Sequence, residues 1–169
     1  MGVIGKIQRF FTEQGRYITM DLERQVFNDL KRHEGCVLKP YRDTVGVWTI
    51  GYGHTHGVTA LTKPITQDKA EQYLKEDMIH AFEVARKLFP NYSDLDKVRK
   101  SVLVNMAFNL GQTKLAKFYA TIRAVKEENY VQAALQMLAS KWASQVGQRS
   151  KELANRMASG RIDPHHLVT

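Results

Sequence analysis

Residues 33–54 read HEGCVLKPYRDTVGVWTIGYGH, and this stretch decides the fold. Residues that favour strands, among them Tyr41, Trp48 and Ile50, stand here between glycines that suit tight turns. The residues on either side of the stretch have a helical pattern instead. We therefore expect a small antiparallel sheet over residues 37–56, inserted between helices.

Helical patterns lie on both sides of this sheet. Before it, apolar residues recur at helical spacing and predict a first helix from about Asp21 to His33. After a loop, Thr66 can cap a long helix, and Pro90 ends that helix because proline cannot continue it. Further helices are expected from Ser93 or Asp94 to Gly111 and over residues 114–125, 130–142 and 148–159.

The predicted fold class is α+β: a small antiparallel sheet lobe and a larger helical lobe, joined by a long helix. The sheet lobe is expected over residues 21–65, the connector helix over residues 66–89, and the helical lobe over residues 90–169. Residues 1–20 form a basic amphipathic extension before the main domain of residues 21–169. Such an extension either touches an anionic membrane or packs onto its own domain.

Composition narrows the class of protein. The chain has 169 residues, enough for one domain or two small lobes with a shared core, and it contains no run of about twenty apolar residues. Its net charge is +8, which attracts polyanions without choosing among envelope polymers, lipids and nucleic acid. The single cysteine, Cys36, cannot form an internal disulfide and is expected to be a small buried filler.

One carboxylate of the connector helix stands out. Asp77 falls on the apolar face of that helix, where an unpaired charge is costly. It therefore needs a cationic or hydrogen-bonding partner. The sheet lobe offers His54 and His56, and we expect an ion pair between Asp77 and a histidine.

Three residues around the sheet could carry acid–base chemistry. Glu34 ends the first helix, Asp43 lies in a turn, and Thr49 lies in the following strand. Cleavage of a glycosidic bond needs one carboxylic acid that donates a proton and one ionised carboxylate that steadies charge or directs water. Burial at a helix end favours a protonated Glu, and a polar turn favours an ionised Asp. From these residues alone, the alternative is a pair of solvated surface carboxylates.

The same stretch resembles the catalytic segment of lysozymes of the bacteriophage T4 type, glycoside hydrolases with the motif Glu, eight residues, Asp, five residues, Thr. Glu34, Asp43 and Thr49 satisfy both spacings, and the flanking EG, Y-x-D-T and TIGYGH also agree. Two later segments, DLDKVRKSVLVNMAFNLGQ and SKWASQVGQRSKELANR, are similar to the helical lobe of that family. The resemblance covers roughly residues 21–162.

The resemblance implies a phage endolysin that hydrolyses the β-1,4 bond between N-acetylmuramic acid and N-acetylglucosamine in bacterial peptidoglycan and lyses the host cell. Glu34 would be the general acid. Asp43, helped by the Thr49 hydroxyl, would position or activate the attacking water, which inverts the sugar carbon. Because the family includes variants with Cys in place of the Asp, a nucleophilic role for Asp43 stays open.

Further positions follow from the match alone. Arg149 falls where the family has an arginine that pairs with the catalytic Glu, and His54 and Asp77 match the family's His–Asp ion pair. A packing or surface role is the alternative for the positions that correspond to saccharide contacts, which are Thr55, Phe108, Thr121 and Gln136.

The sequence departs from the T4 enzyme in three places. Residues 1–20 have no counterpart there, and the loop between Thr55 and Thr66 is shorter. His33 replaces an acidic neighbour of the catalytic Glu, so the pH optimum does not follow from the resemblance.

The resemblance favours a monomer that is held in the host cytoplasm until a holin opens the membrane, since no secretory signal or transmembrane segment is apparent. Peptidoglycan is the expected partner, with membrane contact through residues 1–20 at most and no nucleic acid. No cofactor is implied, and no metal, because the histidine pairs lack acidic or thiol ligands nearby. A glycan-binding module without activity and a basic nucleic-acid binder are the alternative classes.

Overall fold

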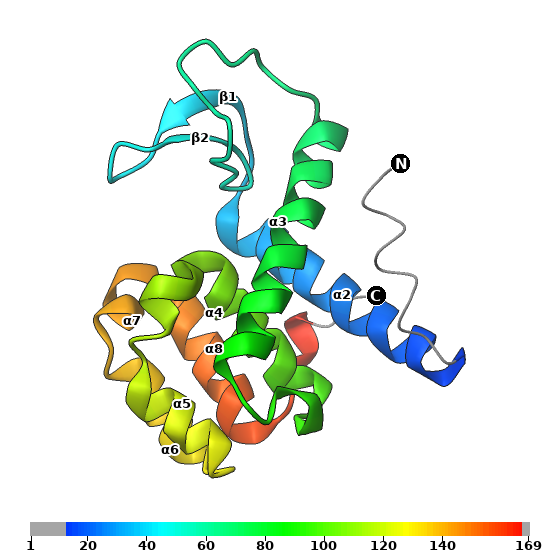
Figure 1. Cartoon of the computed structure of the whole chain (residues 1–169), viewed down its shortest axis with the longest axis vertical. Helices are drawn as coiled ribbons and strands as arrows, with labels where there is room; N and C mark the ends of the chain where they lie inside the picture. Colours follow the sequence, from blue (N-terminus) through cyan, green and yellow to red (C-terminus); the bar gives the residue numbers. More distant parts are fainter. Residues whose placement is uncertain (1–12, 167–169) are drawn as a thin grey trace.

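The computed structural model describes the backbone of residues 13–166 and the side chains of residues 22–165. In chain order its elements are α2 (Glu13–Glu34), β1 (Val37–Arg42), β2 (Trp48–Gly51), α3 (Gln67–Leu88), the 3-10 turn η2 (Tyr92–Asp94), α4 (Lys97–Leu115), α5 (Tyr119–Lys126), α6 (Tyr130–Leu138), α7 (Lys141–Val146), α8 (Gln148–Ser159) and the 3-10 turn η3 (Pro164–His166). Figure 1 shows β1 and β2 in a small sheet lobe, and α4 to α8 in a larger helical lobe. Helix α3 runs from one lobe to the other, and the predicted α+β class is confirmed.

The sheet consists of the antiparallel pair β1 and β2, which is smaller than the range expected from the sequence. Tyr41 faces Thr49 across the two strands. The turn between the strands is closed by hydrogen bonds from the backbone N–H of Asp43 to Val47 O (2.9 Å) and from Gly46 N–H to Asp43 O (3.0 Å). This short hairpin places the Asp43 side chain at the tip of the sheet lobe.

Helix α2 begins eight residues before the predicted Asp21, at Glu13, so it passes through the boundary expected after residue 20. The remaining part of the expected extension, residues 1–12, lies outside the described residues. The cap predicted for the connector helix is confirmed, because the Thr66 hydroxyl accepts a hydrogen bond from the N–H of Lys69.

Three predicted helix boundaries in the helical lobe are wrong. The Ser93–Asp94 segment forms only the turn η2, since the Asp96 carboxylate accepts from Arg99 N–H and starts α4 there. The predicted helix over residues 114–125 begins only at Tyr119. The predicted helix over residues 130–142 breaks at Ser140, whose hydroxyl caps α7 by accepting from Ala143 N–H. In each case a local side-chain bond or turn overrides the apolar period.

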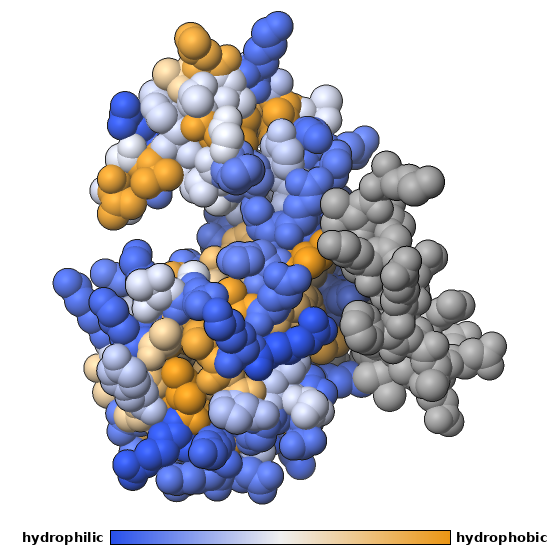
Figure 2. All heavy atoms as spheres, in the orientation of Figure 1, coloured by the Kyte–Doolittle hydropathy of each residue, from blue (hydrophilic) through white to orange (hydrophobic). Residues whose placement is uncertain are grey.

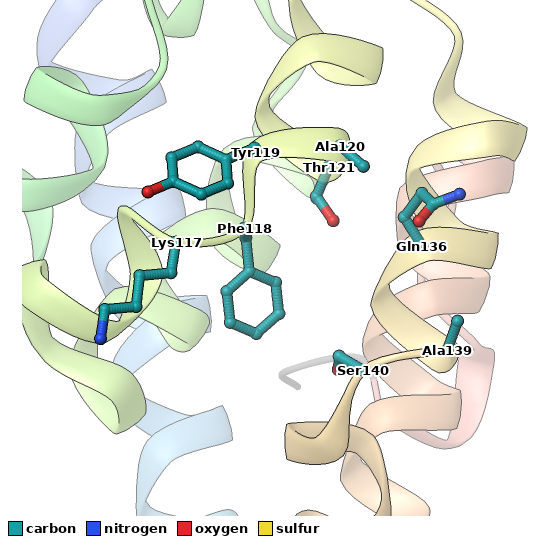
Figure 3. A pocket seen from close by; sticks show the side chains of 8 residues that line it. All are labelled: Lys117, Phe118, Tyr119, Ala120, Thr121, Gln136, Ala139 and Ser140. Carbon is teal, nitrogen blue, oxygen red and sulfur yellow. The ribbon is translucent and has the colours of Figure 1, made fainter.

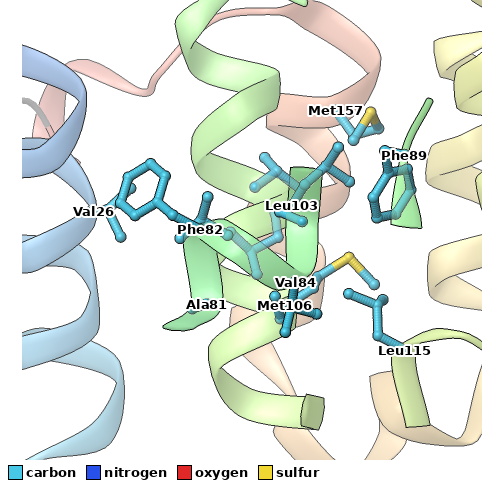
Figure 4. Packing of buried hydrophobic residues seen from close by; sticks show 14 of the residues in the cluster. Val26, Ala81, Phe82, Val84, Phe89, Leu103, Met106, Leu115 and Met157 are labelled. Atoms are coloured by element: carbon cyan, nitrogen blue, oxygen red, sulfur yellow. The ribbon is translucent and has the colours of Figure 1, made fainter. Parts of the chain in front are cut away.

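The core lies where helices of both lobes meet. Figure 4 shows Val26 of α2 against Phe82 of α3, beside Leu103 of α4 and Met157 of α8. All four side chains are buried. Burial of a side chain of this size contributes about 1.5–3 kcal/mol, so this cluster holds α2, α3, α4 and α8 together.

The expectation for Cys36 is wrong, because this residue is exposed. The backbone turns at Gly35, which has a φ of 66°, and leads directly into β1. Most side chains of β1 face solvent, and Cys36 at its start shares that environment. Its thiol therefore fills no core space.

Candidate active site

Glu34 is the last residue of α2 and lies at the junction of the two lobes (Figure 1). Its side chain is 18% exposed. Arg149, at the start of α8, donates from Nη1 to Oε1 of Glu34 over 2.7 Å. The helix end therefore presents a mostly buried carboxyl group with one oxygen held by a guanidinium.

The second oxygen of Glu34 faces the sheet lobe. Gly53 has a φ of 88°, and a Cβ atom there would lie 3.9 Å from Glu34 Oε2. A positive φ is a conformation that glycine adopts without steric cost. Gly53 thus turns the chain beside Oε2 and leaves space there, away from the oxygen that Arg149 holds.

Arg149 is itself fixed by Asn105 of α4. Asn105 is 1% exposed, and its Oδ1 accepts from both Nε (2.9 Å) and Nη2 (2.7 Å) of Arg149. These two bonds converge on one oxygen and orient the guanidinium group so that Nη1 points at Glu34. The sequence analysis missed Asn105. The only signal was an amide between Val104 and Met106, in a helix segment that is otherwise apolar.

Asp43 is oriented by its own turn. Its Oδ1 accepts from the backbone N–H of Val45 (3.0 Å) and of Val47 (2.8 Å). Both bonds engage the same carboxylate oxygen. These two bonds fix the orientation of the carboxylate at the hairpin.

Thr49 lies in β2 and is 3% exposed. Its hydroxyl donates to the carbonyl oxygen of Val47 over 3.0 Å. Because the hydroxyl proton is engaged in this bond, the lone pairs of Oγ1 are left to accept from a donor such as water. Thr49 lies in the strand that directly follows the Asp43 turn, and it pairs with Tyr41 across the two strands.

Tyr41 connects the two carboxylates electrostatically. Its pKa is raised, first by partial burial and then by the negative charges of Asp43 and Glu34. Both carboxylates therefore lie within electrostatic range of one phenol group, although they come from a hairpin and a helix. The sequence pattern predicts a strand position for Tyr41 and gives no sign of this electrostatic link.

The surface between the two lobes is hollowed, as the space-filling view shows (Figure 2). On the helical lobe, a cavity of about 400 Å³ lies between α5 and α6. Thr121 and Gln136, both predicted saccharide contacts, line it from facing helices (Figure 3). The other two predicted contacts lie elsewhere: Phe108 packs against the core, and Thr55 is exposed in the loop after β2.

The ion pair predicted for Asp77 is confirmed, and its partner is His54. His54 Nδ1 and Asp77 Oδ2 are 2.8 Å apart, and the His54 ring stacks on Tyr73 at a centroid distance of 4.1 Å. Burial raises the pKa of Asp77, although the hydrogen bond with His54 acts in the opposite direction. The other candidate, His56, is exposed. This pair ties the sheet lobe to α3.

Over the part of the chain that the structure describes, no group of three or more His, Cys, Asp or Glu side chains could hold a metal ion. None of the helices within that part has the length and apolarity that a membrane crossing requires.

Known proteins resemble this chain over most of its length. The sequence model of the phage lysozyme family matches residues 31–159. A probable T4-type lysozyme 2 of Dictyostelium discoideum is 28% identical over 158 residues, which cover 79% of this chain and 93% of that protein. The endolysin of Salmonella phage P22 is 32% identical over 119 residues, covering 68% of this chain and 80% of that protein. A SAR-endolysin of Escherichia phage P1 is 33% identical over 98 residues, covering 58% and 52%.

Proposed function

The chain belongs to the phage lysozyme family and is a glycoside hydrolase that cleaves peptidoglycan, and from that premise we propose that Glu34, Asp43 and Thr49 carry the reaction. The substrate bond is the β-1,4 link between N-acetylmuramic acid and N-acetylglucosamine. The observation that supports this assignment best is the contact of Arg149 with Glu34 at the end of α2, and the charges of both Asp43 and Glu34 act on Tyr41.

Glu34 acts as the general acid. Arg149 binds Oε1, so Oε2, on the side of Gly53, is the oxygen that carries the proton to the leaving sugar oxygen. A fixed carboxyl group lowers the barrier because the proton is delivered without reorientation.

Asp43 accepts a proton from the attacking water, and Thr49 Oγ1 accepts the second water hydrogen bond. The water adds to the sugar carbon as the bond to the leaving oxygen breaks, and its remaining hydrogen stays on the new hydroxyl group. Attack from the face opposite the leaving group inverts the anomeric carbon. Direct attack by Asp43 would instead retain the configuration, so the anomer of the product distinguishes the two roles.

Thr121 and Gln136 bind the glycan strand in the cavity between α5 and α6. A hydroxyl and an amide that face each other suit the hydroxyl and acetamido groups of these sugars, and the aromatic rings of Phe118 and Tyr119 line the same cavity. Thr55 and Phe108 contact the strand further along the groove between the lobes.

The decisive test compares wild type with Glu34→Gln on suspensions of purified peptidoglycan. We expect the variant to clear the suspension at least about 100-fold more slowly, since general acid catalysis contributes that much. Product analysis should find new reducing ends on muramic acid, with the inverted anomer in NMR spectra taken immediately after cleavage. Equal clearing by both proteins would overturn the assignment of Glu34, and anhydro-sugars would indicate a transglycosylase instead.

The protein acts as a monomer that waits in the host cytoplasm until a holin admits it to the wall. Related phage proteins are named endolysins, and some of them SAR-endolysins. Residues 1–20 touch the anionic membrane in this proposal. Deletion of these residues should slow the killing of intact cells more than the digestion of purified wall, and an equal loss in both assays would contradict a membrane role. Gel filtration tests whether the protein is a monomer in solution.

A further inference from the structure

We propose that His33 is a positioning residue of this site: its neutral imidazole, protonated on Nε2, holds the Asn105 amide that orients Arg149 against Glu34. The inference rests on the proposed role of Glu34 as the acid. His33 precedes Glu34 in the chain, and its side chain is 5% exposed.

The orientation of Asn105 follows from Arg149. A guanidinium can only donate hydrogen bonds, so the atom of Asn105 that meets Arg149 Nε and Nη2 is the carbonyl oxygen Oδ1. The amide nitrogen Nδ2 then points to His33 Nδ1, at 3.2 Å. Because Nδ2 is a donor, His33 Nδ1 must carry the lone pair.

The other ring nitrogen of His33 therefore carries the hydrogen. His33 Nε2 lies 3.2 Å from Oε2 of Glu152 on α8. Although burial raises the pKa of Glu152, its contacts with the positive charges of Arg32 and Arg156 lower it more, and the net shift is strongly downward. Glu152 is thus an ionised acceptor, and His33 donates to it.

Glu152 belongs to a rigid anchor that we call the ion cluster, formed by Asp29, Arg32, Glu152 and Arg156. Arg32 binds Glu152 through Nη2 (2.6 Å) and Nη1 (2.9 Å), and Arg156 binds it through Nη2 (2.8 Å). Asp29 accepts from both arginines, and its side chain is 4% exposed. The two positive and two negative charges balance, so the cluster fixes the His33 ring without a net charge.

The groups that face His33 come from three helices. On α4 the neutral amide of Asn105 faces His33. The same amide also binds the charged Arg149 of α8. The charged groups around it on α2 and α8 are Asp29, Arg32, Glu34, Glu152 and Arg156.

Protonation of His33 breaks this chain of hydrogen bonds from Glu152 through His33 and Asn105 to Arg149. A second ring N–H would meet the donor Nδ2 of Asn105. If the amide turned over to accept that N–H, its Nδ2 would face the donors of Arg149. In the first case Asn105 loses the contact that holds its amide, and in the second Arg149 loses the acceptor that aligns it. Activity therefore falls on the acid side as His33 takes up a proton, while glycan binding is unaffected.

Two His33 variants and one control test the proposal. His33→Gln offers an oxygen and an NH₂ group at similar separation but does not titrate, whereas His33→Leu offers neither. His80→Gln is the matched control, because His80 is 72% exposed on α3. Initial rates at limiting and saturating purified peptidoglycan are measured from pH 4 to 8, together with thermal unfolding.

We expect His33→Leu to lose about tenfold in kcat at neutral pH with KM unchanged, which corresponds to one transition-state contact. Wild type and His80→Gln should share the same loss of activity toward low pH, the acid limb of the rate profile. His33→Gln should retain most of kcat and move this acid limb to lower pH, where protonation of the proposed base Asp43 limits the rate. In wild type, ¹⁵N chemical shifts of His33 should show the Nε2–H tautomer and a titration midpoint that coincides with this limb.

The proposal is overturned if His33→Gln keeps the wild-type acid limb or if the ¹⁵N shifts show hydrogen on Nδ1 at neutral pH. The NMR measurement uses wild type, so it decides even where His33→Leu does not fold. Failure of the proposed function has a different signature, since Glu34→Gln would then clear peptidoglycan as fast as wild type.

Discussion

Arg149 binds Glu34 across 115 positions of sequence, with 2.7 Å between Nη1 and Oε1. This contact joins the first turn of α8 to the last residue of α2. The helical lobe therefore does more than support the groove, because it places the side chain that we propose as the acid.

Replacement of Arg149 by lysine should show whether Glu34 needs only a positive charge nearby or also the fixed geometry of the guanidinium group. An ammonium group keeps the positive charge but cannot bind Asn105 twice and Glu34 at the same time. We expect kcat to fall about 10- to 100-fold with little change in KM. Steady-state rates on purified peptidoglycan check this, and an unchanged kcat would show that charge alone suffices.

Asp43→Asn should lose activity and keep stability. The asparagine Oδ1 can still accept from Val45 and Val47, so the turn persists, but the amide cannot take a proton from water. Clearing should fall at least about 100-fold, while the melting temperature changes little.

Asp43→Ala is the contrasting variant. It removes both side-chain hydrogen bonds of the turn and should lower the free energy of unfolding by about 1–2 kcal/mol in addition to the loss of activity. Thermal melts of the two variants side by side make the comparison. Full activity of Asp43→Asn would exclude Asp43 as the base.

Glu152→Gln should destabilise the protein by about 1.5–3 kcal/mol at neutral pH, because buried Arg156 and partly exposed Arg32 then keep only Asp29 as a charged partner. The folded-state pKa of Glu152 lies below its unfolded value, so the stabilisation is complete above the unfolded value of about 4.3 and is lost as the pH falls toward the folded value. Urea unfolding at several pH values should show wild type and variant converge as the pH is lowered from 6 to 3. A constant difference would contradict the downward shift.

Gly53→Ala should impair activity beyond its effect on stability. Both Gly53 and Gly57 have a positive φ, so alanine at either position should cost about 1–2 kcal/mol through backbone strain. Only at Gly53 does the new methyl group approach Glu34, at 3.9 Å from Oε2, whereas nothing lies within 4 Å at Gly57. We expect slower clearing for Gly53→Ala alone at a temperature where both variants are folded, and equal rates would show that the space beside Oε2 is not needed.

Local chemistry explains which elements could be predicted. The Thr66 cap follows from neighbouring residues, and the need of Asp77 for a histidine follows from its place on an apolar helix face. Both contacts are present, although the choice of His54 over His56 came only from the family resemblance. The start of α4 at Asp96 and the break at Ser140 were missed, because a short polar side chain competes with the apolar period and either result is consistent with the pattern.

The sequence by itself determined the α+β class, the family and the candidate residues Glu34, Asp43 and Thr49, because turn residues, helical periods and motif spacing are local properties of the chain. The link from Arg149 through Asn105 and His33 to the ion cluster became visible only in the tertiary structure. Those contacts join α2, α4 and α8 over separations of up to 127 residues, and their geometry depends on how whole helices pack rather than on any neighbouring residues.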